Sequence, residues 1–131
     1  MNNISENSAL TRIGQIAINV HDVDRATAFY RDVLALPHLF RAGHLSFFNC
    51  GGVRLMLSPP EKPEFDHAGS ILYFQVVDIQ AAFQRIKSAG VKFEDEPHLI
   101  ARMPTHELWM SFFHDTEGNL LALMSELPNK A

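Results

Sequence analysis

Residues 15–34 change hydrophobic period once, at Asp22, and this change constrains the fold more than any other stretch of the chain. Before Asp22, apolar residues alternate with others along 15–20, as in a strand with one buried face. After it, apolar residues recur at three- and four-residue intervals from Val23 to Leu34, as in an amphipathic helix. Asp22 can accept hydrogen bonds from the free amides at the start of that helix. The stretch therefore predicts a strand, a cap and a helix, in this order.

The same pattern occurs a second time. With an offset of 56 residues, Asp22 matches Asp78 and Ala26 matches Ala82. A second strand over 71–77 is thus predicted to lead into a second helix, which ends at a glycine suited to a left-handed C-cap. Further strands are predicted at 39–41, 45–49, 53–58, 107–113 and 119–125. The predicted fold is α+β, built from two tandem βαβββ modules.

The second half carries an insertion. Its last hairpin matches the first half with an offset of 66, so that Gly52 falls on Gly118, and ten residues are therefore inserted before it. The insertion lies in or near 94–106, which contains two prolines and two histidines. Long loops in small domains are often functional, so we interpret this segment as an extended loop that forms a lid or a wall of a site.

The length of 131 residues suits one compact domain. Proline is frequent in 59–69, which cannot continue a strand ladder and is predicted to be a linker. The expected organisation is a flexible N-terminal arm (1–12), a first βαβββ module (13–58), the linker (59–69) and a second βαβββ module (70–131).

Composition excludes several classes of partner. The formal net charge is −4 and no run of lysine or arginine occurs, which argues against a nucleic-acid partner. No apolar run is long enough to span a bilayer, so no membrane partner is expected. The only cysteine, Cys50, cannot form an internal disulfide, and no leader of the signal-peptide type opens the chain. We therefore expect a cytoplasmic protein.

Two phrases carry a resemblance to a known family: DVDRATAFYRDVLAL at 22–36 and FFHDTEGNLLALMSE at 112–126. With the tandem modules, they resemble the vicinal oxygen chelate superfamily of glyoxalases, bleomycin-resistance proteins and extradiol dioxygenases, over about residues 13–126. The resemblance implies a half-open mixed β-barrel with helices on the convex side, a ligand cavity on the concave side, and a homodimer. Whether each cavity closes within one chain or across two stays open.

The resemblance also implies where a metal would bind. In metal-dependent members, histidine, glutamine and glutamate ligands occupy concave positions that correspond here to Gln15, Met56, Ile71 and Ala122. Only Gln15 can coordinate a cation, because thioether and hydrocarbon side chains supply no ligand for such an ion. The usual metal site is therefore expected to be absent, and no cofactor is expected. The alternative is a divalent metal bound by a displaced set: Gln15, His98, His106 and Glu126.

The candidate ligand-binding residues are Gln15, Asn19, Arg54, Met56, Tyr73, Gln75, Met103, Trp109 and Met124. Asn19 and Gln75 occupy corresponding positions in the two modules, and their amides either bind a ligand or make structural hydrogen bonds. Arg54 can bind a carboxylate or phosphate, or pair across an interface. Trp109 either stacks on a ligand or packs in the core.

The candidate catalytic residues are Tyr73 and His106, with a core aromatic and a solvated loop histidine as the structural alternatives. Three functions follow. The first is a glyoxalase-like protein or enzyme that binds an unidentified small molecule in a largely apolar cavity without the usual metal. The second is an antibiotic-sequestering protein of the bleomycin-resistance kind. The third is a metal-dependent lyase or dioxygenase with displaced ligands.

Overall fold

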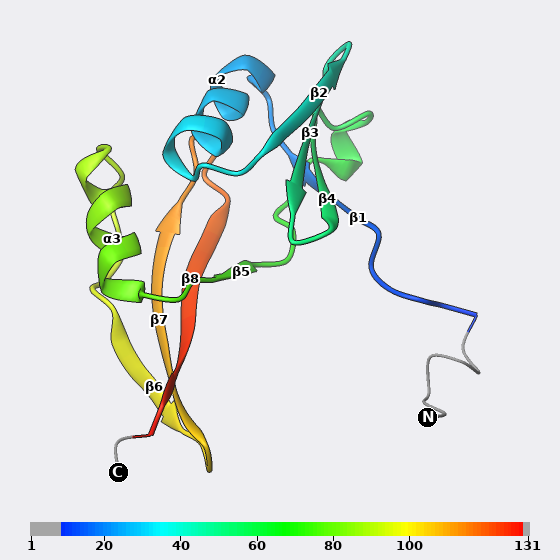
Figure 1. The fold of residues 1–131 in the computed structure, drawn as a ribbon. Helices are drawn as coiled ribbons and strands as arrows, with labels where there is room; N and C mark the ends of the chain where they lie inside the picture. Colours follow the sequence, from blue (N-terminus) through cyan, green and yellow to red (C-terminus); the bar gives the residue numbers. More distant parts are fainter. Residues whose placement is uncertain (1–8, 130–131) are drawn as a thin grey trace.

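The computed structural model describes residues 9–129, whose strands form two four-stranded mixed sheets. Sheet A has the order β1-β4-β3-β2 and sheet B the order β5-β8-β7-β6. The first module contains β1 (Gln15–Asn19), α2 (Val23–Ala28), the π-helical turn η1 (Phe29–Val33), β2 (His38–Ala42), β3 (Leu45–Cys50) and β4 (Val53–Ser58). A 3-10 turn, η2 (Pro63–Phe65), lies in the linker, and the second module contains β5 (Leu72–Gln75), α3 (Ile79–Ser88), β6 (His98–Arg102), β7 (His106–His114) and β8 (Leu120–Pro128). The predicted α+β fold of two tandem βαβββ modules is confirmed (Figure 1).

Both helices begin as the sequence predicts. The Asp22 carboxylate accepts a hydrogen bond from the Arg25 amide at 3.0 Å, and the Asp78 carboxylate accepts one from the Ala81 amide at 3.0 Å. These bonds satisfy amides that have no partner within the helix. Gly90 follows α3 with a φ of 97°, a backbone conformation that favours glycine.

The core lies between each helix and the face of the sheet that it covers. In sheet A, Leu55 and Leu57 are almost fully buried, and in sheet B the corresponding residues Leu121 and Leu123 are buried in the same way. The apolar stripe of α3 packs on sheet B through Phe83 and its neighbours one turn away. Because side chains alternate along a strand, the other set of residues points away from the helices, and we call these two surfaces the concave faces.

The inserted segment of the second module contains a strand, so its prediction as an extended loop was wrong. Residues 98–102 form β6, the outer strand of sheet B, paired antiparallel with β7. In addition, β7 and β8 are nine residues long, whereas β3 and β4 are six. The insertion therefore lengthens sheet B, and the β6–β7 hairpin extends well beyond α3 (Figure 1).

The loop between β7 and β8 joins the two modules. The Tyr30 hydroxyl donates a hydrogen bond to the Asp115 carboxylate at 2.7 Å, and both residues are buried. The Asn119 amide donates to the Asn19 carbonyl at 3.1 Å. The Glu117 carboxylate accepts bonds from backbone amides at the start of α2. The two phrases that carry the family resemblance are therefore in direct contact.

Most of the predicted N-terminal arm lies outside the described residues, although Arg12 donates a hydrogen bond to the Gly52 carbonyl at 3.0 Å. Among residues 9–129, no helix is long and apolar enough to cross a membrane.

Candidate ligand-binding site

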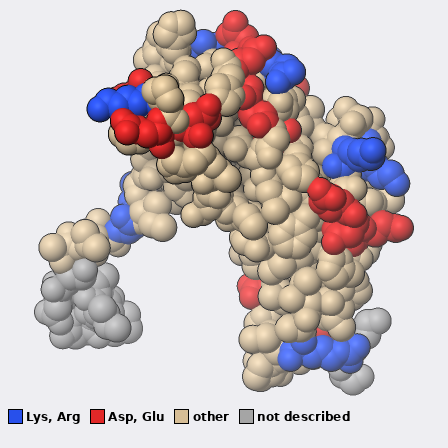
Figure 2. All heavy atoms as spheres, turned by 180° about the vertical axis from the view of Figure 1, so that it is seen from behind, with Lys and Arg blue, Asp and Glu red and all other residues tan. Residues whose placement is uncertain are grey.

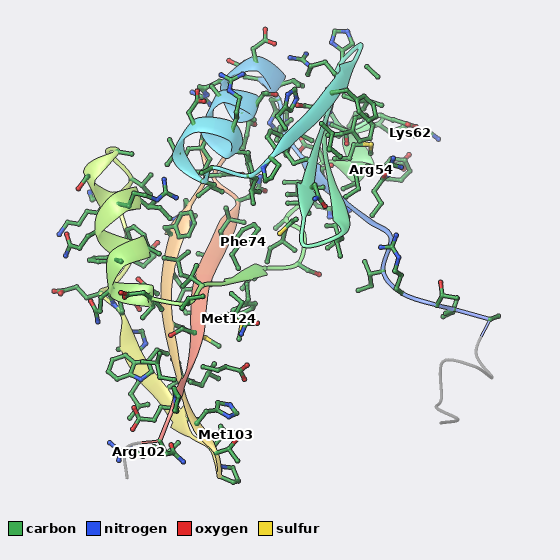
Figure 3. All side chains as sticks on the ribbon, viewed as in Figure 1. Arg54, Lys62, Phe74, Arg102, Met103 and Met124 are labelled. Carbon is green, nitrogen blue, oxygen red and sulfur yellow. The ribbon has the colours of Figure 1, made fainter. Side chains whose placement is uncertain are left out.

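The concave face of sheet A carries a polar cluster on β1 and β4. Gln15 lies opposite Arg54 in the parallel register. The Arg54 Nε donates to the Gln15 Oε1 at 2.8 Å, and the Gln15 Nε2 lies 3.8 Å from the Met56 sulfur. The Arg54 guanidinium also lies over the Phe47 ring, 5.3 Å from its centroid. Arg54 lies on the side of the sheet away from α2 (Figure 3).

An aromatic pair continues this face toward the outer strand. Phe40 on β2 lies opposite Phe47 on β3, and their rings are stacked with centroids 4.5 Å apart. Phe47 is buried, whereas Phe40 is 46% exposed. Phe40 therefore adds an exposed aromatic ring to the concave face, next to the Phe47 ring that lies under the Arg54 guanidinium.

The concave face of sheet B is largely apolar. The Tyr73 and Phe112 rings meet edge to face with centroids 5.9 Å apart, and Ala122 lies between them in the register. Ala122 has no exposed surface, while Tyr73 is 44% exposed. Met124 follows Ala122 on this face and lies opposite Gln75, which is exposed. The surface is hollowed between the two modules, and few charged side chains line the hollow (Figure 2).

A histidine–glutamate pair stands at the far end of sheet B. The His106 Nε2 lies 3.0 Å from the Glu126 carboxylate, and the His106 Nδ1 lies 3.1 Å from the Thr105 hydroxyl. Two of the four residues in the displaced metal set are thus adjacent. The third, His98, has its Nδ1 3.6 Å from an Asp95 carboxylate oxygen. Gln15 belongs to the other sheet and is engaged by Arg54.

The structure divides the remaining predicted site residues. Asn19 donates to the Phe65 and His67 carbonyls at 2.8 and 3.3 Å, so its side-chain amide holds the linker. Within residues 9–129, the Gln75 side chain makes no such bond. Trp109 packs against the buried core on the helix side of sheet B and does not reach the concave face. Met103 lies at the far end of the β6–β7 hairpin, distant from Arg54 (Figure 3).

Two clefts adjoin these elements. One, of about 780 Å³, lies between β1, the linker and the start of β8, and its lining includes Asn19, His21 and Ile71. The other, of about 850 Å³, lies on the helix side, between η1 and the segment after α3. The first borders the concave faces. The second lies on the helix side, away from the concave faces, so we do not assign the site to it.

Next to the first cleft, the His21 imidazole lies between two carboxylates. The His21 ring nitrogens lie 2.9 Å from the Asp66 carboxylate and 3.1 Å from the Glu117 carboxylate. The hydrogen bonds with Asp66 and then Glu117 raise the pKa of His21. Burial acts to raise the pKa of Glu117, but bonds from the His21 and Asp22 amides outweigh it and the pKa is lowered. His21 thus joins the linker to the second module.

The residues at the family's metal positions do not fit a metal. Ala122 is enclosed between Tyr73 and Phe112 and offers neither a donor atom nor room for one. Met56 and Ile71 supply a thioether and a hydrocarbon, and the Gln15 oxygen accepts a bond from Arg54. Among residues 9–129, no group of three or more histidine, cysteine, aspartate or glutamate side chains is arranged to hold a metal ion.

Comparison with known proteins decides the family. The family model described as Glyoxalase/Bleomycin resistance protein/Dioxygenase superfamily matches residues 12–123. The chain belongs to this superfamily. No curated protein matches this superfamily member.

Solved structures agree with this assignment. A lactoylglutathione lyase from Agrobacterium tumefaciens is 25% identical, with a TM-score of 0.72 over 90% of this chain and 96% of that one. TnmS3, an antibiotic binding protein from Streptomyces sp. CB03234, is 19% identical, with a TM-score of 0.72 over 93% of this chain and 99% of that one. The two similar structures therefore carry different functions on one fold.

Sequence reasoning missed the aromatic part of the concave faces. Phe40, Phe47 and Phe112 contribute to these faces, but none was among the predicted site residues. If the pairing of β3 with β4 had been known, the position of Phe47 opposite Met56 would have placed both side chains on the same face. A bulge in the β2–β3 register precedes Phe40 and interrupts the alternation of side chains along β2. The sequence pattern therefore does not indicate on which face of the sheet Phe40 lies.

Proposed function

We propose that this protein binds a small organic molecule on its concave faces without the metal ion used by the metal-dependent members of its superfamily. The observation that carries the proposal is the enclosure of Ala122 between Tyr73 and Phe112, which puts an apolar floor where a metal ligand would stand. Binding sites for small molecules are typically apolar surfaces with a few convergent polar groups. Here the polar groups are Arg54 and Gln15 on sheet A and Gln75 on sheet B.

Sequestration is the form of this function that we favour. TnmS3, which has the same fold, is an antibiotic binding protein. An open apolar face without a metal-ligand set supports affinity for a ligand directly, because burial of apolar surface alone stabilises a complex. Tyr73, Gln75 and Met124 would contact the ligand on sheet B, with Arg54 and Met56 on sheet A.

A ligand screen with a matched pair of variants tests the proposal. Thermal shifts of the wild-type protein against aromatic and thioether-containing small molecules identify binders, and calorimetry measures their affinity. Tyr73→Ala is expected to weaken binding several-fold through loss of aromatic contact. Val77→Ala removes a side chain that is 94% exposed, outside the proposed site, and should leave affinity unchanged. Equal affinity of the two variants, or the absence of any binder, would contradict the proposal.

Catalysis is a second candidate, and the adjacency of His106 and Glu126 favours it. A histidine held by a carboxylate can act as a general base once a substrate displaces one of its partners. If the protein is an enzyme, His106→Gln should abolish product formation while ligand binding persists, and Glu126→Gln should reduce turnover to a smaller extent. His44→Gln, in the exposed β2–β3 turn, is the control. Unchanged turnover in His106→Gln would exclude this role.

We also propose a homodimer. The exposed rings of Phe40 and Tyr73 leave the concave faces open within one chain, and a second copy would close these faces around a ligand bound there. Light scattering after size exclusion measures the mass in solution. A monomer at micromolar concentration would contradict this part of the proposal, but it would leave ligand binding possible.

A further inference from the structure

Arg54 differs from the arginines that form ion pairs elsewhere in the molecule. Within the described residues, Arg25, Arg41 and Arg102 each lie within 4.0 Å of a carboxylate on another element, and Arg31 pairs with the adjacent Asp32. Arg54 has no carboxylate partner in this part of the chain. Its bonds are to a neutral amide and an aromatic face. A guanidinium without a counter-charge on an apolar surface has unused binding capacity for an anion.

The orientation of Arg54 is set by its neighbours. The Nε–H donates to the Gln15 Oε1, and the guanidinium carbon lies over the Phe47 ring. Arginine has five N–H donors, and the described residues engage only the one on Nε. The two Nη groups therefore remain free to form a bidentate pair with an oxyanion. Because the side chain is already held, less rotamer entropy is lost when it binds.

The other residues on the concave face of sheet A also favour anion binding by Arg54. Residues of β1, β3 and β4 that share the face with Arg54 are uncharged: Gln15, Ala17, Asn19, Leu45, Phe47, Asn49, Met56 and Ser58. No acidic side chain of these strands thus competes for the guanidinium. On the neighbouring strands β3 and β2, the stacked Phe47 and Phe40 rings offer an aromatic surface on the same face of the sheet.

We propose that Arg54, held by Gln15 and Phe47, binds the carboxylate of an aromatic ligand whose ring packs on Phe40 and Met56. The inference rests on the proposed binding function and names the chemical class of its ligand. The positive charge of Arg54 takes the place of a cation at the Gln15 position. Anionic ligands are therefore selected although the protein as a whole carries a net charge of −4.

The test compares two probes of nearly the same shape, the anion 2-naphthoate and the neutral 2-naphthamide, in which an NH2 group replaces one carboxylate oxygen, by calorimetry at fixed salt. Wild-type protein is expected to bind naphthoate about tenfold or more tightly than the amide, the size of one charge-assisted hydrogen bond. Arg54→Gln should remove this preference, and Arg54→Lys should restore part of it. Arg41→Gln makes the same change in net charge on β2 and should keep the full preference.

The outcomes separate the two proposals. If both probes bind equally, or if the preference persists in Arg54→Gln, the assignment of Arg54 is overturned while the binding function stands. If neither probe binds and the wider screen finds no ligand, the binding function fails and the assignment fails with it. Phe40→Ala should weaken both probes to a similar extent, because the ring contact does not depend on charge. Thermal melts of each variant verify that the fold is intact.

Discussion

The two modules share a backbone plan, but they differ on the face that points away from their helices. Gln15 and Arg54 form a hydrogen-bonded pair in the first module, and the corresponding positions of the second are Ile71 and Leu120. Conversely, the Tyr73–Ala122–Phe112 row of the second module corresponds to Ala17, Met56 and Phe47 in the first. The comparison indicates that the helix side is maintained by folding requirements, whereas the concave side has diverged in chemistry.

The largest effect is expected from truncation of the core residues that the modules share. Leu57 and Leu123 are equivalent and almost fully exclude solvent. Leu57→Ala and Leu123→Ala should each lower the free energy of unfolding by about 2–5 kcal/mol, because a cavity replaces the side chain. Denaturant unfolding measures the loss. If the modules fold as one unit, each variant shows a single transition, and a second transition in either would show that they unfold separately.

The two tyrosines sharpen the contrast between buried and open faces. Tyr30→Phe leaves the buried Asp115 carboxylate without one of its donors and should cost about 1.5–3 kcal/mol in the free energy of unfolding. Tyr73→Phe removes a hydroxyl from a half-exposed ring and should change stability by less than about 0.5 kcal/mol. Chemical denaturation of both variants is the measurement. Equal losses would mean that the Tyr30 hydroxyl does not join the modules.

The helix caps test whether the modules are equivalent on the helix side. Asp22→Ala and Asp78→Ala each remove a side-chain bond to a helix amide and should each cost about 1 kcal/mol. Asp24→Ala, which removes the exposed pair with Arg41 and an acidic side chain in the first turn of α2, should cost less, about 0–1 kcal/mol. A much larger loss for one cap than for the other, measured by thermal and chemical unfolding, would break the equivalence.

The smallest effect is a pH dependence at the module junction. His21 has a raised pKa in the folded protein, so its stabilisation is complete below its ordinary pKa of 6.5 and is lost as the pH rises through the raised value. Glu117 acts in the other direction, since its lowered pKa gives stabilisation above 4.5 that is lost as the pH falls through the lowered value. Melting temperature against pH measures both.

His21→Gln should flatten the neutral part of this profile and reduce the acidic part only partly, because the backbone amides of residues 21 and 22 still donate to Glu117 when the imidazole is gone. His44→Gln, in the exposed β2–β3 turn, serves as the control and should keep the wild-type profile. If the melting temperature of His21→Gln still changes with pH near neutrality, this pH dependence belongs to another group.

Much of the helix side could be predicted from the sequence, because its signals are local. The caps Asp22 and Asp78 follow from one polar residue before an apolar stripe, and 53–58 forms β4 with the predicted bounds. β6 was missed because its five residues lie between Pro97 and Pro104, which suggested a loop. A strand at the edge of a sheet tolerates nearby proline better than a central one.

The concave side could be predicted only in part, because it depends on contacts between distant segments. Arg54 and Gln15 share a face by alternation, but their bond requires the parallel register of β1 and β4. Trp109 was ambiguous, since its strand is apolar on both faces and only the pairing with β8 assigns its side. The role of Asn19 depends on linker carbonyls that carry no sequence signal.

The contact between Tyr30 and Asp115 joins positions 85 residues apart in the chain. During synthesis on a ribosome, the first module therefore emerges long before Asp115, whose carboxylate accepts the hydrogen bond from the buried Tyr30 hydroxyl. Non-local closure of this kind slows folding and delays the burial of surfaces already synthesised. The nascent first module must remain incomplete until the β7–β8 loop has been made. A chain truncated before that loop should therefore fail to fold fully and should bind chaperones.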